Sequence, residues 1–435
     1  MSSFEIGLIG FIVLFVILFT GMPIGFCMAL IGFAGLVSLV GWSGALLELG
    51  LIPFTNVASL TLSILPLFVL MGEWSYESGL ADGAYRAIHK ALGHLPGGLA
   101  MSTVGTCAVF AACTGSSIAG AATMTKVALP SMLKYKYSPD LATGVIAAGG
   151  TLGILIPPSA VMIVYGIFTD SSIGKLFIGG VLPGIILASL FMLVIYFWVK
   201  INPMKAPVAK RSSLKEVLIA SKGLWPGLLL AFLIVFGLWG GVFSPSEAGG
   251  IGAGIALLII LIRKGFAFRS IATGLRSTIK TTAMIFTIVI GAMIFNQFMT
   301  ISGLPAKMVI FLQGLSLSPI LVIIILMFIY IILGCVMDSM AMMLLTLPIV
   351  FPIISALGID PILFGILLTI NIEMALITPP IGMVVFVISG IVKEDISLYT
   401  IFRGIWPFLI AIAVCMGLII SIPNIALWLP NTMIK

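Results

Sequence analysis

The stretch Gly149–Gly166, which reads GGTLGILIPPSAVMIVYG, places two adjacent prolines, Pro157 and Pro158, in the middle of an apolar run. Each proline lacks a backbone N–H and clashes with the preceding helical turn, so the pair interrupts any helix that contains it. Hydrocarbon offers no partner for the backbone groups that such a break frees. In a membrane, the break is therefore expected to line a polar cavity enclosed by protein, and a simple proline kink is the alternative.

The chain around this stretch has the composition of a membrane protein. Of its 435 residues, 61% are hydrophobic and only 8% are charged, and the mean hydropathy of +1.31 is far above that of soluble proteins. Apolar runs recur from Phe4 to Leu429 and amount to about ten spans at roughly 20 residues each. We expect an all-α polytopic membrane protein without a cleavable signal peptide, because the first run has no basic start. The five cysteines lie in apolar segments and favour neither disulfides nor a zinc site.

Basic residues crowd two connections between apolar runs and predict the orientation of the chain. They are Lys200, Lys205, Lys210, Arg211, Lys215 and Lys222 in the first connection, and Arg263, Lys264, Arg269, Arg276 and Lys280 in the second. Nucleic-acid binding is the alternative for such runs, but short basic loops between spans mark the cytoplasmic face. The spans Leu224–Gly240 and Pro245–Ile262 separate the two loops, and Ser244 with Glu247 predicts a capping box at the second span. Both termini are then expected on the non-cytoplasmic face, and no nucleic-acid partner is expected.

The proline break has a second copy later in the chain. The stretch ITPPIGMVVFVISG at Ile377–Gly390 repeats LIPPSAVMIVYG at Leu155–Gly166. One offset of 222 residues relates four proline pairs, which are Pro130 and Pro352, Pro139 and Pro361, Pro157 and Pro379, and Pro158 and Pro380. An odd number of expected spans separates equivalent points, so the two halves are expected to have inverted topology. Paired broken helices in inverted halves are the sequence signature of a transporter's central site.

A second pair of features lies upstream of the two breaks. The stretch GTCAVFAACTGSSIAGAATMTKVALP holds two short apolar segments divided by the polar residues Thr114–Ser117, which predicts a re-entrant helical hairpin. The same offset places Ser116 on Asp338, so Gly334 and Asp338 are expected at the tip of a second hairpin. Serine and aspartate are good N-caps for the returning helices.

Four charged residues fall clearly inside apolar segments, and they are Glu73, Lys126, Asp338 and Glu373. An intramembrane charge is a functional hypothesis by default, and Asp338 is the best candidate because it lies at a hairpin tip. Glu373 is expected to pair with Lys126 or to orient the site. For Lys126, the alternative is that its side chain snorkels toward the cytoplasmic face. For Glu73, the alternative is a position near the surface of the protein.

At these residues the sequence resembles the large membrane subunit of the tripartite ATP-independent periplasmic (TRAP) transporters. The matching phrases are GTLGILIPPS, SIGKLFIGGVLPG, TGSSIAGAATM, MDSMAMMLLTLPIVFPI and NIEMALITPPIGMVVFVISGI. The resemblance implies a sodium-driven importer of organic acids in the bacterial inner membrane, with a small membrane subunit and a periplasmic substrate-binding protein as partners. It also implies an elevator motion, in which a unit of hairpins and broken helices slides against scaffold helices.

The resemblance further implies where ions and substrate bind. One sodium site is expected at Thr114, Ser116, Ser117, Gly150 and Thr151, and the other at Gly334, Asp338, Asn371 and Thr378. The organic acid is expected near Ser116, Ser117, Pro157, Pro158, Asp338, Thr378, Pro379 and Pro380. Oxygen ligands suit a sodium ion, and no cofactor other than this coupling ion is expected.

These features divide the chain into five segments. They are scaffold helices at 1–60, a first inverted repeat at 61–199, basic loops and central scaffold helices at 200–279, a second inverted repeat at 280–424, and a tail at 425–435.

Other functions would require other sequence features. A stand-alone sodium–carboxylate symporter would have similar hairpins and no binding protein. A membrane-embedded enzyme is disfavoured, because the only histidines are His89 and His94, and that spacing does not form an HExxH pair on one helical face. An ATP-driven pump would need a G-x-x-x-x-G-K-[ST] loop, which the sequence lacks. A purely structural membrane subunit would not require a duplicated polar interruption.

Overall fold

The computed structural model describes residues 1–57, 59–207, 211–335 and 337–434, and within them every regular element is a helix. The helices of the first half are α1 (Ser3–Leu18), α2 (Ile24–Val57), α3 (Ile64–Glu77), α4 (Leu80–Leu92), α5 (Gly98–Thr114), α6 (Ser117–Val127), α7 (Leu129–Lys134), α8 (Pro139–Leu155), α9 (Ala160–Thr169), α10 (Ile173–Ile201) and the short η1 (Pro203–Lys205). The helices of the second half are α11 (Leu214–Ser221), α12 (Trp225–Trp239), α13 (Pro245–Lys264), α14 (Phe268–Ser302), α15 (Leu304–Gly314), α16 (Pro319–Gly334), α17 (Ser339–Ala356), α18 (Pro361–Ile377), α19 (Met383–Val392), η2 (Lys393–Asp395), α20 (Leu398–Ser421) and α21 (Asn424–Asn431). The all-α prediction is confirmed.

The described residues contain seven helical stretches that are long and apolar enough to cross a membrane, with α8 and α9 counted together as one, or up to eight if the bent pair α11 and α12 forms one span. Further apolar helices of 10–17 residues, including α5, α16, α18 and α19, are shorter than a full span. Short helices of this kind are expected where the chain turns back or breaks within the membrane. The sequence-based count of about ten spans stays a prediction.

Helix bounds repeat along the chain with the offset seen in the prolines. The helices α8 and α18 begin and end 222 residues apart, and α17 covers the stretch equivalent to α6 and α7 together. Each break contains a cis peptide bond, at Pro157–Pro158 and at Pro379–Pro380. The two halves therefore contain the same succession of elements around the two breaks.

The paired helices α8 and α18 form the centre of the molecule. Every residue of α8 from Leu141 to Leu155 is buried, and so is every residue of α18 from Ile362 to Glu373. A helix that is apolar on all sides belongs inside the protein. Close crossings with neighbouring helices depend on glycine: a Cβ on Gly404 of α20 would lie 1.9 Å from the backbone oxygen of Asp140. The centre thus holds both broken helices in place.

A second group of helices packs beside this centre. The long helices α2 and α14 lie against each other, and α3 packs against both α13 and α14. A Cβ on Gly291 would lie 2.0 Å from the backbone oxygen of Gly25, so glycine allows α2 and α14 to approach closely. We call α2, α3, α13 and α14 the frame. The predicted segments put α3 in the first repeat and most of α14 in the second, and this division stays a prediction.

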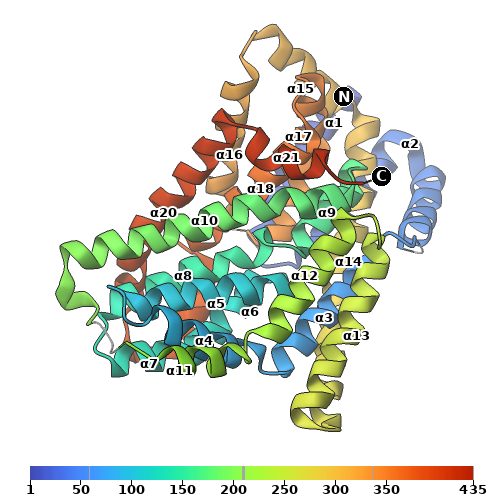
Figure 1. The fold of residues 1–435 in the computed structure, drawn as a ribbon. Coiled ribbons are helices and arrows are strands. Elements are labelled where there is room, and N and C mark those ends of the chain that lie inside the picture. The colour runs from blue at the N-terminus through green and yellow to red at the C-terminus, as the bar shows by residue number, and fades with distance from the viewer. Residues whose placement is uncertain (58, 208–210, 336, 435) are drawn as a thin grey trace.

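The basic connections gather at one end of the molecule. Figure 1 shows α4, α7, α11 and the C-terminal end of α13 at the end opposite to both termini, α15 and α21. At that end Arg263 donates to the carbonyl oxygens of Gly79 at 3.0 Å and Gly223 at 3.2 Å, and Lys90 pairs with Glu216 at 3.1 Å. These contacts tie both basic loops to α4. The predicted capping box of Ser244 and Glu247 at the start of α13 is confirmed.

Candidate functional site

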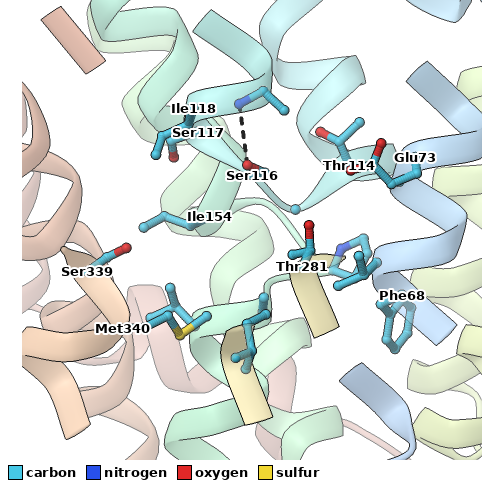
Figure 2. A pocket seen from close by; sticks show the side chains of 18 of the residues that line it. Phe68, Glu73, Thr114, Ser116, Ser117, Ile118, Ile154, Thr281, Ser339 and Met340 are labelled. Atoms are coloured by element: carbon cyan, nitrogen blue, oxygen red, sulfur yellow. Dashed lines mark hydrogen bonds between the residues drawn. The ribbon is translucent and has the colours of Figure 1, made fainter. Parts of the chain in front are cut away.

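A cavity of ≈300 Å³ lies where two interhelical tips meet the frame helices α3 and α14. The first tip joins α5 to α6, and the second joins α16 to α17. Figure 2 shows Glu73 and Thr114 on one side of this central cavity and Ser339 and Met340 across from them. Its walls therefore come from both halves of the repeat and from the frame.

The first tip is built around a glycine turn. The helix α5 ends at Thr114, and Gly115 has a φ of 62°, in the left-handed region that favours glycine. Ser116 then begins α6 as its N-cap, with a hydroxyl that accepts a hydrogen bond of 3.3 Å from the amide of Ala119. A Cβ on Gly115 would lie 2.6 Å from the carbonyl oxygen of Pro158, so the tip packs directly on the first break. The predicted cap at Ser116 is confirmed.

Asp338 is the corresponding residue of the second tip. Its carboxylate caps α17 by accepting a hydrogen bond of 3.2 Å from the amide of Met340, and the Ser339 hydroxyl donates to it at 3.4 Å. All three residues line the central cavity. The predicted cap is confirmed, and a role in binding stays a prediction. Gly334, by contrast, is absent from the cavity lining, and a Cβ on it would lie 2.3 Å from the Cβ of Ala375 in α18.

The two breaks take different positions relative to the central cavity. At the first break, α8 ends at Leu155 and α9 resumes after Ser159, whose hydroxyl caps it by accepting from the amide of Met162 at 3.3 Å. Pro158 lines the cavity, whereas Pro157 is not among the lining residues. At the second break, the predicted residues Thr378, Pro379 and Pro380 do not line the cavity. Leu376 is the residue of α18 that does.

Glu373 links the two halves at the first break. Its side chain is fully buried, and its Oε1 atom accepts hydrogen bonds from the amide of Ile154 at 3.1 Å and from the hydroxyl of Ser117 at 3.5 Å. Its second oxygen, Oε2, has no hydrogen-bond partner in the described residues. Glu373 in the second half therefore accepts a hydrogen bond from a backbone amide close to the break in the first half.

Lys126 does not pair with Glu373. Its side chain is exposed, whereas Glu373 is fully buried, and the ion pairs of the described residues do not include the two. The expected pairing is therefore wrong, because Glu373 turns toward α8 and Lys126 faces outward from α6. The other alternative for Glu373, that it orients the site, stays open.

The residues of the first predicted sodium site lie partly together. The Ser117 hydroxyl donates to the backbone oxygen of Thr151 at 3.3 Å, and Gly150 packs on Ala121 of α6, where a Cβ would lie 2.8 Å from the Ala121 Cβ. The Thr114 hydroxyl is turned to its own helix and donates to Phe110 at 3.0 Å. Carbonyl and hydroxyl oxygens thus converge at the contact between α6 and α8, and ion binding there stays a prediction.

The residues of the second predicted sodium site are more dispersed. The side-chain amide of Asn371 donates to the carbonyl oxygen of Met327 at 3.0 Å, while its Oδ1 atom is buried without a partner in the described residues. The Thr378 hydroxyl donates back to the carbonyl oxygen of Met374 at 2.6 Å. Asp338 lies at the cavity, but no hydrogen bond among the described residues joins it to Asn371 or Thr378.

Sequence reasoning missed the frame side of the central cavity. Glu73 and Tyr76 of α3 and Thr281 of α14 line it, and none belongs to the repeated motifs. Glu73 is one of the four charges in apolar segments, which is the signal that points to it, and a position near the surface is the alternative to a functional role. Its position opposite the tips depends on packing between segments about 200 residues apart.

The described residues show no group of three or more His, Cys, Asp and Glu side chains that could hold a metal ion. Neither histidine lines the central cavity. Carbonyl, hydroxyl and carboxylate oxygens are ligands for hard cations, and ion binding here stays a prediction.

Comparison with known proteins places the whole chain in one family. The family described as "Tripartite ATP-independent periplasmic transporter, DctM component" matches residues 11–425. The C4-dicarboxylate TRAP transporter large permease protein DctM of Pseudomonas aeruginosa is 37% identical over 85% of this chain and 86% of that protein. The 2,3-diketo-L-gulonate TRAP transporter large permease protein YiaN of Escherichia coli is 32% identical over 93% and 94%. The sialic acid TRAP transporter large permease protein SiaM of Vibrio cholerae is 29% identical over 95% and 96%.

A solved structure shares the fold at low sequence identity. The YdaH transporter of Alcanivorax borkumensis superposes with a TM-score of 0.64, covers 89% of each chain and is 15% identical in sequence. At this identity the likeness concerns the fold alone.

Proposed function

This chain belongs to the DctM family of TRAP transporter large permease subunits, and on that premise we propose that it imports an organic acid together with sodium ions. The family is one of multi-pass bacterial membrane transporters, so the chain is a transport protein and not an enzyme. The observation that carries the proposal is the central cavity, which is bounded by both tips and the first break on one side and by the frame on the other.

The substrate class follows from the relatives. Their names mention C4-dicarboxylates, sialic acid and 2,3-diketo-L-gulonate, and all of these are carboxylates at neutral pH. A carboxylate could accept hydrogen bonds from free backbone amides at the N-termini of α6 and α17, which begin at the cavity. We therefore assign an organic carboxylate to the space between Ser117 and Ser339.

The charges of the central cavity support coupling to sodium. Among its lining residues are the acids Glu73 and Asp338, and the lining includes no lysine or arginine. An anion brought into such a cavity would meet like charge without a cationic partner, which is costly away from bulk water. Sodium ions bound beside Ser117 and Asp338 would balance this charge. The substrate would then bind favourably only when the ions are present.

We further propose that the transport motion is an elevator. The tips and broken helices pack around α8 and α18, whereas the frame helices pack on one another. A cavity at the boundary between two such packed groups can change its exposure when one group slides against the other. The small membrane subunit would then bind the frame. The binding protein would dock at the face that carries the termini, which we assign to the periplasmic side of the inner membrane.

A stand-alone symporter is not favoured. The relatives at 29–37% identity are named as TRAP transporter large permease proteins, and the family description names the tripartite system. We therefore expect activity to require the binding protein.

The proposal is tested with the large and small subunits reconstituted in liposomes. Purified binding protein, loaded with one radiolabelled carboxylate at a time, is added outside with either sodium or potassium as the external cation. We expect uptake only with an inward sodium gradient and only with the binding protein. Uptake of equal rate in potassium, with no pH gradient present, would contradict sodium coupling. Equal uptake without binding protein would favour the stand-alone symporter.

A further inference from the structure

A second cavity adjoins the central one on the side of the basic loops. It measures ≈310 Å³ and is lined by Tyr76, Glu77, Gly79, Ala81, Asp82, Thr123, Lys126, Val127 and Lys264. These residues come from α3 and α4, from α6, and from the end of α13. Because α4 and the end of α13 lie opposite to the termini (Figure 1), this cavity lies toward the end that carries the basic connections.

The two cavities share a wall. Tyr76 of α3 and Thr123 of α6 line both of them. Of these two residues, Tyr76 is 40% exposed, whereas Thr123 is buried. Thr123 lies on the opposite side, with its hydroxyl turned to its own helix, where it donates to Ala119 at 2.7 Å. The two cavities therefore meet between a frame helix and a tip helix, at Tyr76 and Thr123.

Lys126 stands just beyond this opening. It follows Thr123 by three residues in α6, so both side chains lie on one face of the helix. Lys264, the other cation of the second cavity, donates to the carbonyl oxygen of Glu77 and is held there. Lys126 makes no hydrogen bond or ion pair with the described residues. Its charge is thus free to interact with a passing ion.

The charge of the route changes along its length. The central cavity is lined by acids without a lysine or arginine, whereas the second cavity has two lysines beside Glu77 and Asp82. Charges that line a narrow, low-dielectric passage focus the field and raise the local concentration of the opposite ion. The lining thus changes from two uncompensated acids to two acids balanced by two lysines, so an anion whose sodium ions had left would be repelled less beside Lys126 than in the central cavity.

We propose that the substrate anion leaves the central cavity between Tyr76 and Thr123, and that Lys126 draws it into the second cavity and toward the cytoplasm. This assignment rests on the proposed function for the direction of transport. Lys126 is then a positioning residue for release and does not bind the substrate in the central cavity. This role suits Lys126, which is exposed, whereas Lys264, the other lysine of the second cavity, is held by the carbonyl oxygen of Glu77.

The opening is tested by charge-selective labelling, which does not require transport. A single cysteine is introduced as Thr123→Cys after the five native cysteines are replaced, and inside-out vesicles are treated with anionic sulfonatoethyl or cationic trimethylammonioethyl methanethiosulfonate. We expect Lys126→Glu to lower the ratio of anionic to cationic labelling rates about tenfold, the lower end of such focusing effects. The matched control is Lys134→Glu, a reversal of an exposed charge near the same helix that lines neither cavity.

Uptake provides the second measurement. We expect Lys126→Arg to transport normally and Lys126→Glu to lower the maximal uptake rate while the half-saturating concentration of loaded binding protein is unchanged. An equal labelling ratio in Lys126→Glu and Lys134→Glu would overturn the inference, as would normal uptake by folded Lys126→Glu. If the unsubstituted protein transported no carboxylate, the proposed function would fail, while the labelling ratio would still decide whether Lys126 governs the opening.

Discussion

The carboxylate of Glu373 accepts a hydrogen bond of 3.1 Å from the backbone amide of Ile154, which lies 219 residues earlier in the chain. Ile154 is one residue before the end of α8, and Glu373 is four residues before the end of α18. The second half of the repeat thus supplies a polar partner at the break in the first half. Lipid offers no hydrogen-bond partner for polar groups. This bond between the two halves is therefore expected to couple their folding.

Replacing Glu373 separates its structural role from any role of its charge. Glu373→Ala removes this buried hydrogen bond between the two halves, which we expect to cost about 1–3 kcal/mol. Glu373→Gln keeps an acceptor oxygen and nearly the same volume, so its stability should stay close to that of the unsubstituted protein. Thermal midpoints of the detergent-purified variants give the comparison, and equal midpoints for both variants would show that the bond is unimportant.

Asp338→Ala tests whether the second tip binds ions or substrate. As a helix cap alone, Asp338 contributes about 1 kcal/mol to stability. If its carboxylate also faces bound sodium, the variant should insert and assemble yet lose sodium-driven uptake. Asp360→Ala is the matched control, because Asp360 caps α18 through the amides of Ile362 at 2.8 Å and Leu363 at 3.1 Å and does not line the cavity. Similar uptake by the two variants would leave Asp338 with the role of a cap only.

Gly404→Val is expected to destabilise the crossing of α20 with α8. A Cβ at this position would meet the backbone oxygen of Asp140 at 1.9 Å, and backbone cannot move aside as a flexible side chain can. Overpacking of this kind costs about 1–3 kcal/mol or more. Gly417→Val in the same helix is the control, since a Cβ there has no neighbour within 4 Å in the described residues. Expression and thermal midpoint should fall for the first variant and stay nearly normal for the second.

Cysteine labelling tests the predicted inversion of the two halves. Lys136 and Asp360 are both exposed; Lys136 lies in the loop before α8, and Asp360 is the N-cap of the equivalent helix α18. In a cysteine-free background, Lys136→Cys should react with an impermeant maleimide only from the cytoplasmic side, and Asp360→Cys only from the other side. Labelling of both positions from one side would rule out inverted topology and, with it, the elevator proposal.

One substitution can test the elevator motion itself. A Cβ on Gly227 of α12 would lie 3.8 Å from the Sγ atom of Cys113 in α5, within reach of a bridge after small adjustments. The sequence analysis places α12 in the scaffold, and α5 belongs to the first hairpin. In a background that keeps Cys113 alone, Gly227→Cys should lose uptake on oxidation and regain it on reduction. Unchanged uptake after complete bridging would mean that these helices do not move apart during transport.

Composition and repeated motifs were enough to predict the class of this protein. An apolar chain with short basic loops has few structural solutions, because backbone polar groups in lipid must be satisfied within helices. Local features were also readable: Ser116, Asp338 and Ser244 cap helices as predicted, since a cap requires only residues within one turn. The offset of 222 residues between the two Pro-Pro breaks also separates the bounds of α8 from those of α18.

Tertiary structure alone decided which polar groups meet. Sequence offered Lys126 as the partner of Glu373, but packing turned Glu373 to the Ile154 amide and left Lys126 beside the second cavity. Periodicity likewise could not show that Glu73 faces the cavity or that the second break stands back from it. Such contacts depend on how helices distant in sequence cross, and crossings are set by the glycines and side chains of both partners together. The sequence therefore determined that a polar site exists, and the packing of α3, α8, α14 and α18 determined which residues face it.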